Sequence, residues 1–129
     1  MNNRPLCLLV DDEADVLTVT ISTLEAINIA CLTASNIQTA KQLLHTHTFD
    51  VCLADVVLPD GNGILELARY IKIHYPNLPV IIFSATGSKD DRERARKEAM
   101  KVGAYGFVAK PIDNNELRAL IKKALHIEN

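Results

Sequence analysis

Five short apolar runs alternate along the chain with longer stretches in which apolar residues recur at helical spacing. The runs cover residues 6–10, 29–34, 51–54, 80–83 and 105–109. Short apolar runs bounded by polar residues, Pro or Gly are typical of strands buried on both faces of a parallel sheet. The intervening stretches, such as residues 64–71, each predict an amphipathic helix. Five strand–helix units predict an α/β domain with right-handed crossovers and helices on both faces of the sheet.

Three polar signals mark where the predicted helices begin or end. Ser35 with Gln38 has the spacing of a capping box and predicts the start of the second helix. Asp113 followed by Glu116 predicts the start of the last helix, and Gly103 predicts the C-terminus of the fourth. The fourth stretch, residues 89–101, has dense charges and a thin apolar stripe. We expect either a solvated helix or a weakly anchored surface that a partner recognises.

Composition limits the size and setting of the protein. The chain has 129 residues, 48% of them hydrophobic and 23% charged, which predicts one domain over residues 1–129. A net charge of −2 gives no electrostatic reason to expect direct binding of nucleic acid or a membrane surface. No apolar run has the length of a membrane span or the form of a signal peptide. Cys7, Cys31 and Cys52 lie in apolar runs, which predicts buried thiols in a reducing cytoplasm.

The ends of the predicted strands carry the candidate chemistry. Because parallel strands end at the same edge of a sheet, we expect Asp11, Asp12, Asp55, Ser84 and Lys110 to lie together. Three neighbouring carboxylates need a compensating cation, and oxygen ligands beside phosphate favour Mg²⁺. A lysine and a hydroxyl suit phosphoryl oxygens, and an Asp carboxylate is a known covalent acceptor of phosphoryl groups. Together they predict phosphoryl transfer by positioning and charge neutralisation.

Several residues at or near the predicted strand ends occur in an order that resembles a known family, over essentially the whole chain. These residues are Asp11-Asp12, Asp55 followed by Pro59, Ser84-Ala85, Phe107 and Lys110-Pro111. In this order they resemble the CheY-like receiver domain of response regulators in two-component signalling. The resemblance implies a flavodoxin-like (βα)5 sandwich with a five-stranded parallel sheet in the order 2-1-3-4-5.

The resemblance also implies roles at the strand ends. Asp55 is expected to accept a phosphoryl group from a phosphohistidine on a sensor histidine kinase or a histidine phosphotransfer protein. Asp12, Asp55 and the backbone carbonyl of Val57 would bind Mg²⁺ directly, with Asp11 holding it through water. Lys110 would pair with Asp55 or the phosphoryl oxygens.

A switch and an output face follow from the same resemblance. Ser84 would turn to hydrogen-bond the phosphoryl group, and Phe107 would rotate into the space that it leaves. The surface formed by the fourth helix, fifth strand and fifth helix would then shift between conformations. A downstream effector or a homodimer partner would bind the conformation that phosphorylation favours. On this interpretation the chain carries no effector domain and is no enzyme beyond its own phosphorylation and dephosphorylation.

Three positions and one segment depart from common family features. Phe107 stands where Tyr is frequent, so the rotation would rest on packing alone. Val57 has no polar side chain to orient an attacking water, which predicts slow self-dephosphorylation. Asn62-Gly63 replaces a frequent Asp-Gly, and the segment 84–103 is about one helical turn longer than usual.

Three other interpretations are weaker. A phosphatase or mutase with an Asp nucleophile needs a second carboxylate two residues later, where this chain has Val57. A mononucleotide binder needs a small-residue phosphate loop after the first strand, where Asp11-Asp12-Glu13 repels phosphate. A receiver-fold docking module that takes no phosphate remains the principal alternative, although the set of acids, hydroxyl and lysine disfavours it.

Overall fold

The computed structural model describes residues 4–55, 63–85, 88–110 and 112–127, without the side chains of residues 63–65, 84 and 85. The predictions that concern Val57, Pro59, Asn62 and Pro111 lie outside the described residues.

Five strands and five helices alternate along the chain, as the apolar pattern predicts. The strands are β1 (Leu6–Val10), β2 (Ala30–Ala34), β3 (Val51–Asp55), β4 (Val80–Ala85) and β5 (Gly106–Lys110). The helices are α1 (Ala14–Glu25), α2 (Ile37–Thr46), α3 (Gly63–His74), α4 (Lys89–Lys101) and α5 (Asn114–Ala124). The strands form one parallel sheet in the order β2-β1-β3-β4-β5, which confirms the predicted topology.

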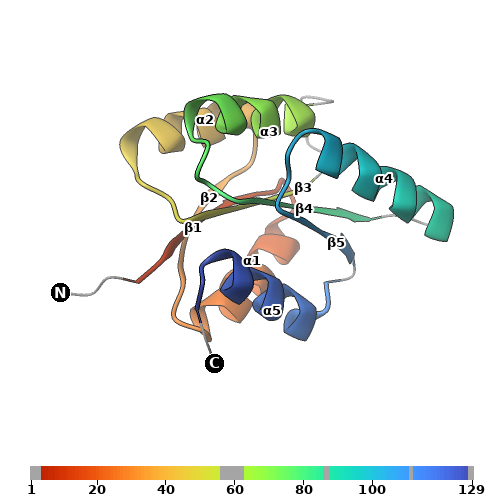
Figure 1. Cartoon of the computed structure of the whole chain (residues 1–129). Coiled ribbons are helices and arrows are strands. Elements are labelled where there is room, and N and C mark those ends of the chain that lie inside the picture. The colour runs from red at the N-terminus through yellow and green to blue at the C-terminus, as the bar shows by residue number, and fades with distance from the viewer. Residues whose placement is uncertain (1–3, 56–62, 86–87, 111, 128–129) are drawn as a thin grey trace.

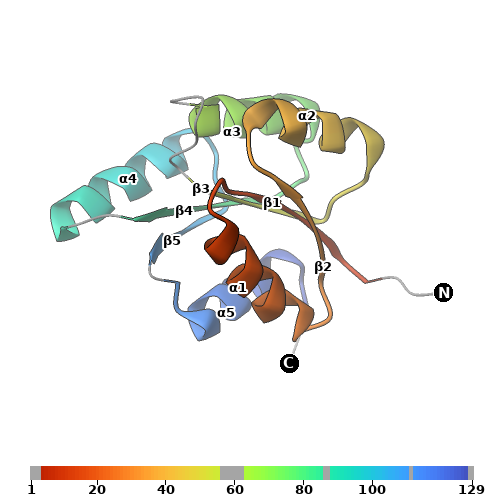
Figure 2. The ribbon, with the colours of Figure 1, turned by 180° about the vertical axis from the view of Figure 1, so that it is seen from behind.

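The sheet separates two layers of helices (Figure 1). Helices α1 and α5 cover one face, while α2, α3 and α4 lie on the other, and the reverse view shows the same division (Figure 2). Every residue of β3 is buried because this central strand is covered on both faces. Its alternate residues serve different layers: Cys52 and Ala54 pack on the side of α2 and α3, while Val51 and Leu53 pack on the side of α1 and α5.

The helix boundaries follow local capping chemistry. Helix α5 begins as predicted, because the Asp113 carboxylate accepts hydrogen bonds from the backbone N–H groups of Asn115 and Glu116. Gly103 follows α4 with φ +87°, a conformation that glycine adopts without strain. The predicted cap of α2 was wrong by one residue, since Asn36, rather than Ser35, caps this helix. Asparagine and serine are comparable N-caps, and the two residues are adjacent.

Two strands reach further toward the site than the apolar runs indicated. Strand β4 ends at Ala85 rather than Phe83, and β5 comprises Gly106–Lys110 rather than 105–109. The cause is the register, which pairs Ser84 with Ala109 and Ala85 with Lys110. Polar residues at strand ends therefore belong to the sheet itself, which fixes their backbone positions.

Burial of the cysteines differs in one case from the prediction. Cys7 and Cys52 are fully buried, but Cys31, on the edge strand β2, is half-buried. None of the helices in the described ranges is long and apolar enough to cross a bilayer.

Candidate functional site

Adjacent strands bring two acidic residues to the same edge of the sheet. Asp55 is the last residue of β3, and Asp11 directly follows β1, its neighbour in the sheet. The register pairs Val10 with Ala54, so the two aspartates stand side by side. A hydrogen bond from the Asp11 backbone N–H to the Ala34 carbonyl, 3.0 Å long, fixes the chain here. Both aspartates are buried, which is uncommon for carboxylates without partners.

Lys110, at the end of β5, supplies the cation that these carboxylates need. Its Nζ lies 3.1 Å from Oδ2 of Asp55 and 3.4 Å from Oδ2 of Asp11. The same ammonium lies 5.0 Å from the centre of the Phe83 ring, within the range of a cation–π contact. The Lys110 side chain is only 12% exposed, so solvent screens these interactions weakly.

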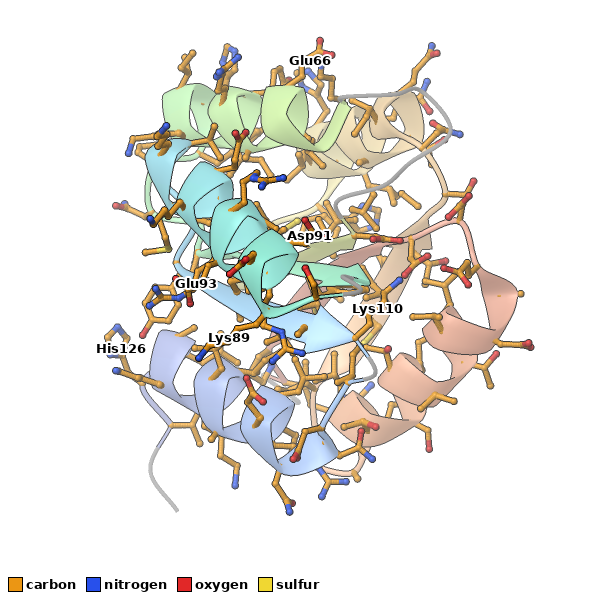
Figure 3. The ribbon with its side chains drawn as sticks, turned by 90° about the vertical axis from the view of Figure 1, so that its right-hand side faces the viewer. Glu66, Lys89, Asp91, Glu93, Lys110 and His126 are labelled. Carbon is orange, nitrogen blue, oxygen red and sulfur yellow. The ribbon has the colours of Figure 1, made fainter. Side chains whose placement is uncertain are left out.

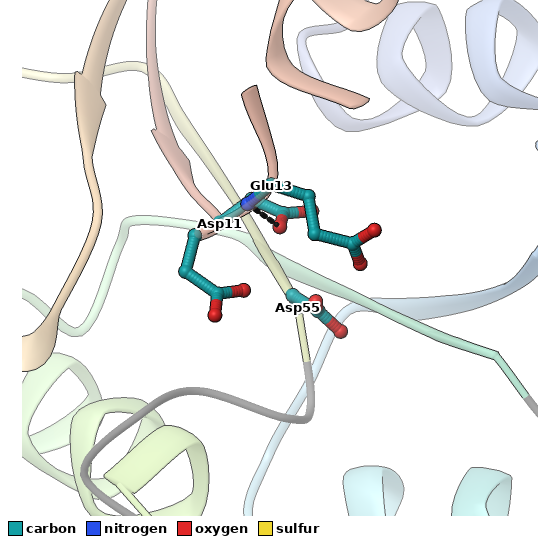
Figure 4. A group of neighbouring side chains, drawn as sticks. Asp11, Glu13 and Asp55 are labelled. Atoms are coloured by element: carbon teal, nitrogen blue, oxygen red, sulfur yellow. Dashed lines mark hydrogen bonds between the residues drawn. The ribbon is translucent and has the colours of Figure 1, made fainter. Parts of the chain in front are cut away.

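Glu13 is a member of the cluster to which the sequence reasoning gave no role. Its Oε1 lies 3.5 Å from Nζ of Lys110, although its side chain is 61% exposed. Its backbone N–H donates to Oδ1 of Asp11, at 2.9 Å, the contact drawn in Figure 4. Glu13 directly follows the acidic pair Asp11-Asp12, and that adjacency was the one signal in the sequence that could have assigned it.

The proton affinities of the cluster reflect its burial and its charges. Burial, and then the nearby charge of Asp55, raise the pKa of Asp11, while the N–H of Glu13 and the ammonium of Lys110 partly offset this. Burial alone would lower the pKa of Lys110. The hydrogen bond to Asp55 and the surrounding carboxylates outweigh it, so the pKa of Lys110 lies above its usual value. Lys110 therefore stays charged at neutral pH.

The acidic cluster fits a hard divalent cation. Asp11, Asp12, Glu13 and Asp55 each offer a ligand oxygen, and these oxygens all lie within 4.8 Å of one another. Oxygen-only donors of this kind suit Mg²⁺, which keeps part of its water shell. Asp12 and Glu13 are exposed while Asp11 and Asp55 are buried, so the cluster has one open side through which hydrated ions and phosphate can approach.

The structure describes only part of what was predicted for the remaining site residues, Ser84, Phe107 and Val57. Ser84 lies in β4, one residue from its end, and its side chain is outside the described part of the chain. Phe107 lies in β5, half-buried against the core on the side of α2, α3 and α4. Phe107 also lines a groove of about 430 Å³ between α4 and α5. Val57 lies outside the described residues.

Sheet order and site geometry together define a class of protein. A five-stranded parallel sheet in the order 2-1-3-4-5 with five helices is the fold of CheY-like receiver domains, and in this chain its carboxyl edge has a lysine-neutralised acidic cluster. The chain belongs to the response regulator receiver domain family, whose model matches residues 7–122. It is thus a receiver domain of the two-component type, and members of this family generally bind Mg²⁺.

Curated relatives extend well beyond this chain. The response regulator protein PilR of Pseudomonas aeruginosa is 39% identical over 127 residues, which are 98% of this chain and 27% of that protein. The DNA-binding transcriptional regulator NtrC of Escherichia coli is 33% identical over 122 residues, 95% of this chain and 25% of that protein. The chain therefore spans about a quarter of the length of these relatives.

Solved structures share the fold. A response regulator from Chloroflexus aurantiacus superposes with a TM-score of 0.86 at 25% identity, covering 96% of this chain and 99% of that one. The beryllofluoride-activated NtrC4 receiver domain dimer superposes with a TM-score of 0.83 at 30% identity, covering 94% and 96%.

Proposed function

We propose that this receiver domain takes a phosphoryl group onto Asp55 from a phosphohistidine and passes the signal on through a change in its α4–β5–α5 face. The donor would be a sensor histidine kinase or a histidine phosphotransfer protein. The domain would process no substrate besides its own acceptor, and the protein would work in the cytoplasm, where such kinases present their phosphohistidines.

The observation that carries the proposal is the contact between Lys110 and Asp55. The two residues are 55 positions apart in sequence, and Nζ and Oδ2 are 3.1 Å apart. An ionised carboxylate held at the open edge of a sheet is a nucleophile, and an adjacent ammonium can accept charge that develops on a phosphoryl oxygen. The buried Asp11 beside them concentrates negative charge that favours a cation at the same place.

Transfer requires one bond to form and one to break. A carboxylate oxygen of Asp55 attacks the phosphorus, the phosphorus–nitrogen bond of the phosphohistidine breaks, and the electron pair returns to the imidazole, which takes up a proton. Lys110 then exchanges part of its contact with Asp55 for a phosphoryl oxygen. Loose transition states of this type depend on positioning and charge stabilisation more than on covalent help from the protein.

The carboxylates of Asp11, Asp12 and Asp55 would hold Mg²⁺, with the Val57 carbonyl as the additional expected ligand. When bound, the ion neutralises the phosphoryl oxygens and the carboxylates together. Glu13 competes for the same lysine from the exposed side, so it tunes how firmly Lys110 is held near Asp55.

The output would begin at Ser84 and Phe107. A hydroxyl drawn toward the phosphoryl group opens space on the neighbouring strand, and the Phe107 ring can move into it. The groove beside Phe107 would then change shape. It is lined by Arg96, Met100, Tyr105, Gly106, Phe107, Glu116, Ala119, Leu120 and Lys123. A downstream effector or a second copy of the domain would bind there, whereas direct contact with nucleic acid is expected only of other parts of a longer regulator.

Acetyl phosphate provides a direct test, because it donates a phosphoryl group without a kinase. We expect intact-mass spectrometry to show one added phosphoryl group on the wild-type domain with Mg²⁺ and none without it. Asp55→Asn should remove the addition, while Asp90→Asn, the same change on the exposed surface of α4, should leave it intact. Wild-type protein that stays unmodified with Mg²⁺ would contradict the proposal and favour the docking module.

A further inference from the structure

Two of the three cysteines lie directly opposite each other on neighbouring strands. The register of β1 and β2 pairs Cys7 with Cys31 as Cα partners. Residues in register on adjacent parallel strands point to the same face of the sheet, and Cys31 packs against the core cluster that contains Cys7. Neighbouring strands lie about 4.8 Å apart. That separation falls within the Cα–Cα range of about 4.4–6.8 Å that a disulfide spans.

The two thiols are also polarised by each other. A hydrogen bond between them lowers the pKa of Cys31, with Arg4 adding to this, while burial and Glu25 act in the opposite direction. The same hydrogen bond, followed by burial, raises the pKa of Cys7 well above its usual value. Cys31 is therefore the member of the pair that forms a thiolate more readily, and Cys7 is the proton donor.

Exposure assigns the same roles. Cys31 is half-buried on β2, an edge strand of the sheet, while Cys7 is fully buried beside it on β1. Small oxidants can reach Cys31 first, and the neighbouring Cys7 is placed to resolve the product within the same chain. An edge strand is bonded to the sheet on one side only, so β2 can make the small adjustment that a disulfide requires.

Cys52 provides an internal contrast. It is fully buried on the opposite face of the sheet, in the other core cluster, and burial raises its pKa to about 12. Its partners in register are Leu8 and Val80, so no thiol lies opposite it on either neighbouring strand. The reactivity is thus confined to one pair.

We propose that Cys7 and Cys31 are a modification site at which peroxide forms a reversible disulfide between β1 and β2. The Cys31 thiolate attacks an oxygen of hydrogen peroxide, so a sulfur–oxygen bond forms, the oxygen–oxygen bond breaks, and hydroxide leaves to be protonated to water. The Cys7 sulfur then attacks the resulting sulfenic acid; the sulfur–sulfur bond forms, the sulfur–oxygen bond breaks, and the Cys7 proton leaves with the hydroxyl as a second water.

The test is titration of the full chain with hydrogen peroxide, followed by intact-mass spectrometry and peptide mapping without reductant. Wild-type protein should lose the mass of two hydrogen atoms, regain it with dithiothreitol, and yield a peptide that joins Cys7 to Cys31. Cys52→Ala, the matched control, should behave as wild type. Cys31→Ser should show no loss of hydrogen.

A second variant, Cys7→Ala, tests the proposal if Cys31→Ser folds poorly. Cys7→Ala leaves Cys31 without its resolving partner, so we expect the sulfenic acid to persist and to be captured by dimedone. Three results would overturn the proposal: oxygen added to wild-type Cys31 with no loss of hydrogen, a disulfide that joins two chains, or a cross-link that includes Cys52.

Discussion

Helices α4 and α5 flank the same strand, β5, but they are attached to the protein in different ways. Helix α5 buries Leu117, Ile121 and Ala124 in the core on its side of the sheet. Helix α4 is two residues longer, 13 against 11, yet among its residues only Ala99 is buried. Figure 3 shows α4 along the outside of the molecule between α3 and α5, with Lys89, Asp91 and Glu93 labelled on it.

The difference shows where the domain can move. Burial of large apolar side chains supplies about 1.5–3 kcal/mol each, so α5 is held by several times the apolar stabilisation that one alanine gives α4. The last turn of α4 is joined to the core mainly through the small residues that follow it, Val102 and Ala104. A helix that is held this loosely needs little free energy to shift, while its neighbour provides a fixed reference.

The largest expected effect tests the attachment of α5. Leu117→Ala should lower the free energy of unfolding by about 2–5 kcal/mol, because it opens a cavity in a closely packed core. Met100→Ala on α4, where the side chain is 48% exposed, should change it by less than about 1 kcal/mol. Urea unfolding followed by circular dichroism measures both. Equal losses from the two substitutions would show that α4 is anchored as firmly as α5.

A smaller effect is expected in local opening. Backbone amides of α4 should exchange with deuterium at least about tenfold faster than those of the buried face of α5, a difference of about 1.4 kcal/mol in opening free energy. Native-state hydrogen exchange read by NMR measures this for each residue. Matching protection in the two helices would remove the physical basis for a mobile α4.

The smallest effect concerns the N-caps. Asp113→Ala removes two hydrogen bonds, of 2.8 and 3.1 Å, at the start of α5 and should cost about 1 kcal/mol of global stability. Ser88→Ala removes one, of 3.1 Å, at the start of α4. Because we expect α4 to open locally before the domain unfolds, this loss should appear as faster amide exchange in α4 with little shift in the urea midpoint. A larger shift of the urea midpoint for Ser88→Ala than for Asp113→Ala would show that α4, rather than α5, is the more firmly attached helix.

Local patterns in the sequence were sufficient for the elements, and for the exposure of α4. Apolar runs locate the strands because a parallel sheet is buried on both faces, and the thin apolar stripe in residues 89–101 corresponds to the exposed helix observed. The strand order came from family resemblance, since hydrophobic periodicity carries no information about which strands are neighbours. The cap of α2 was misplaced by one residue because Ser35 and Asn36 have nearly equal capping propensity.

The sequence predicted which residues form the site better than it predicted the contacts between them. Parallel strands that end at one edge predict that Asp11, Asp55 and Lys110 meet, and they do. The contact of Glu13 with Lys110 depends on side-chain reach across the top of the sheet, which sequence spacing does not encode. The pairing of Cys7 with Cys31 depends on the register of β1 and β2, and periodicity leaves that register undetermined.

The contact between Lys110 and Asp11 joins residues 99 positions apart, and this separation has a consequence for biosynthesis. The amino-terminal half of a growing chain contains every carboxylate of the cluster, but β5 and its lysine are made much later, just before α5. Contacts of such high sequence separation also close late in folding, because the loop entropy must be overcome first. Until then the acids repel one another without a protein cation. A chain that has not reached Lys110 therefore lacks the neutralised Asp55, and under the proposed function we expect that it cannot yet accept a phosphoryl group.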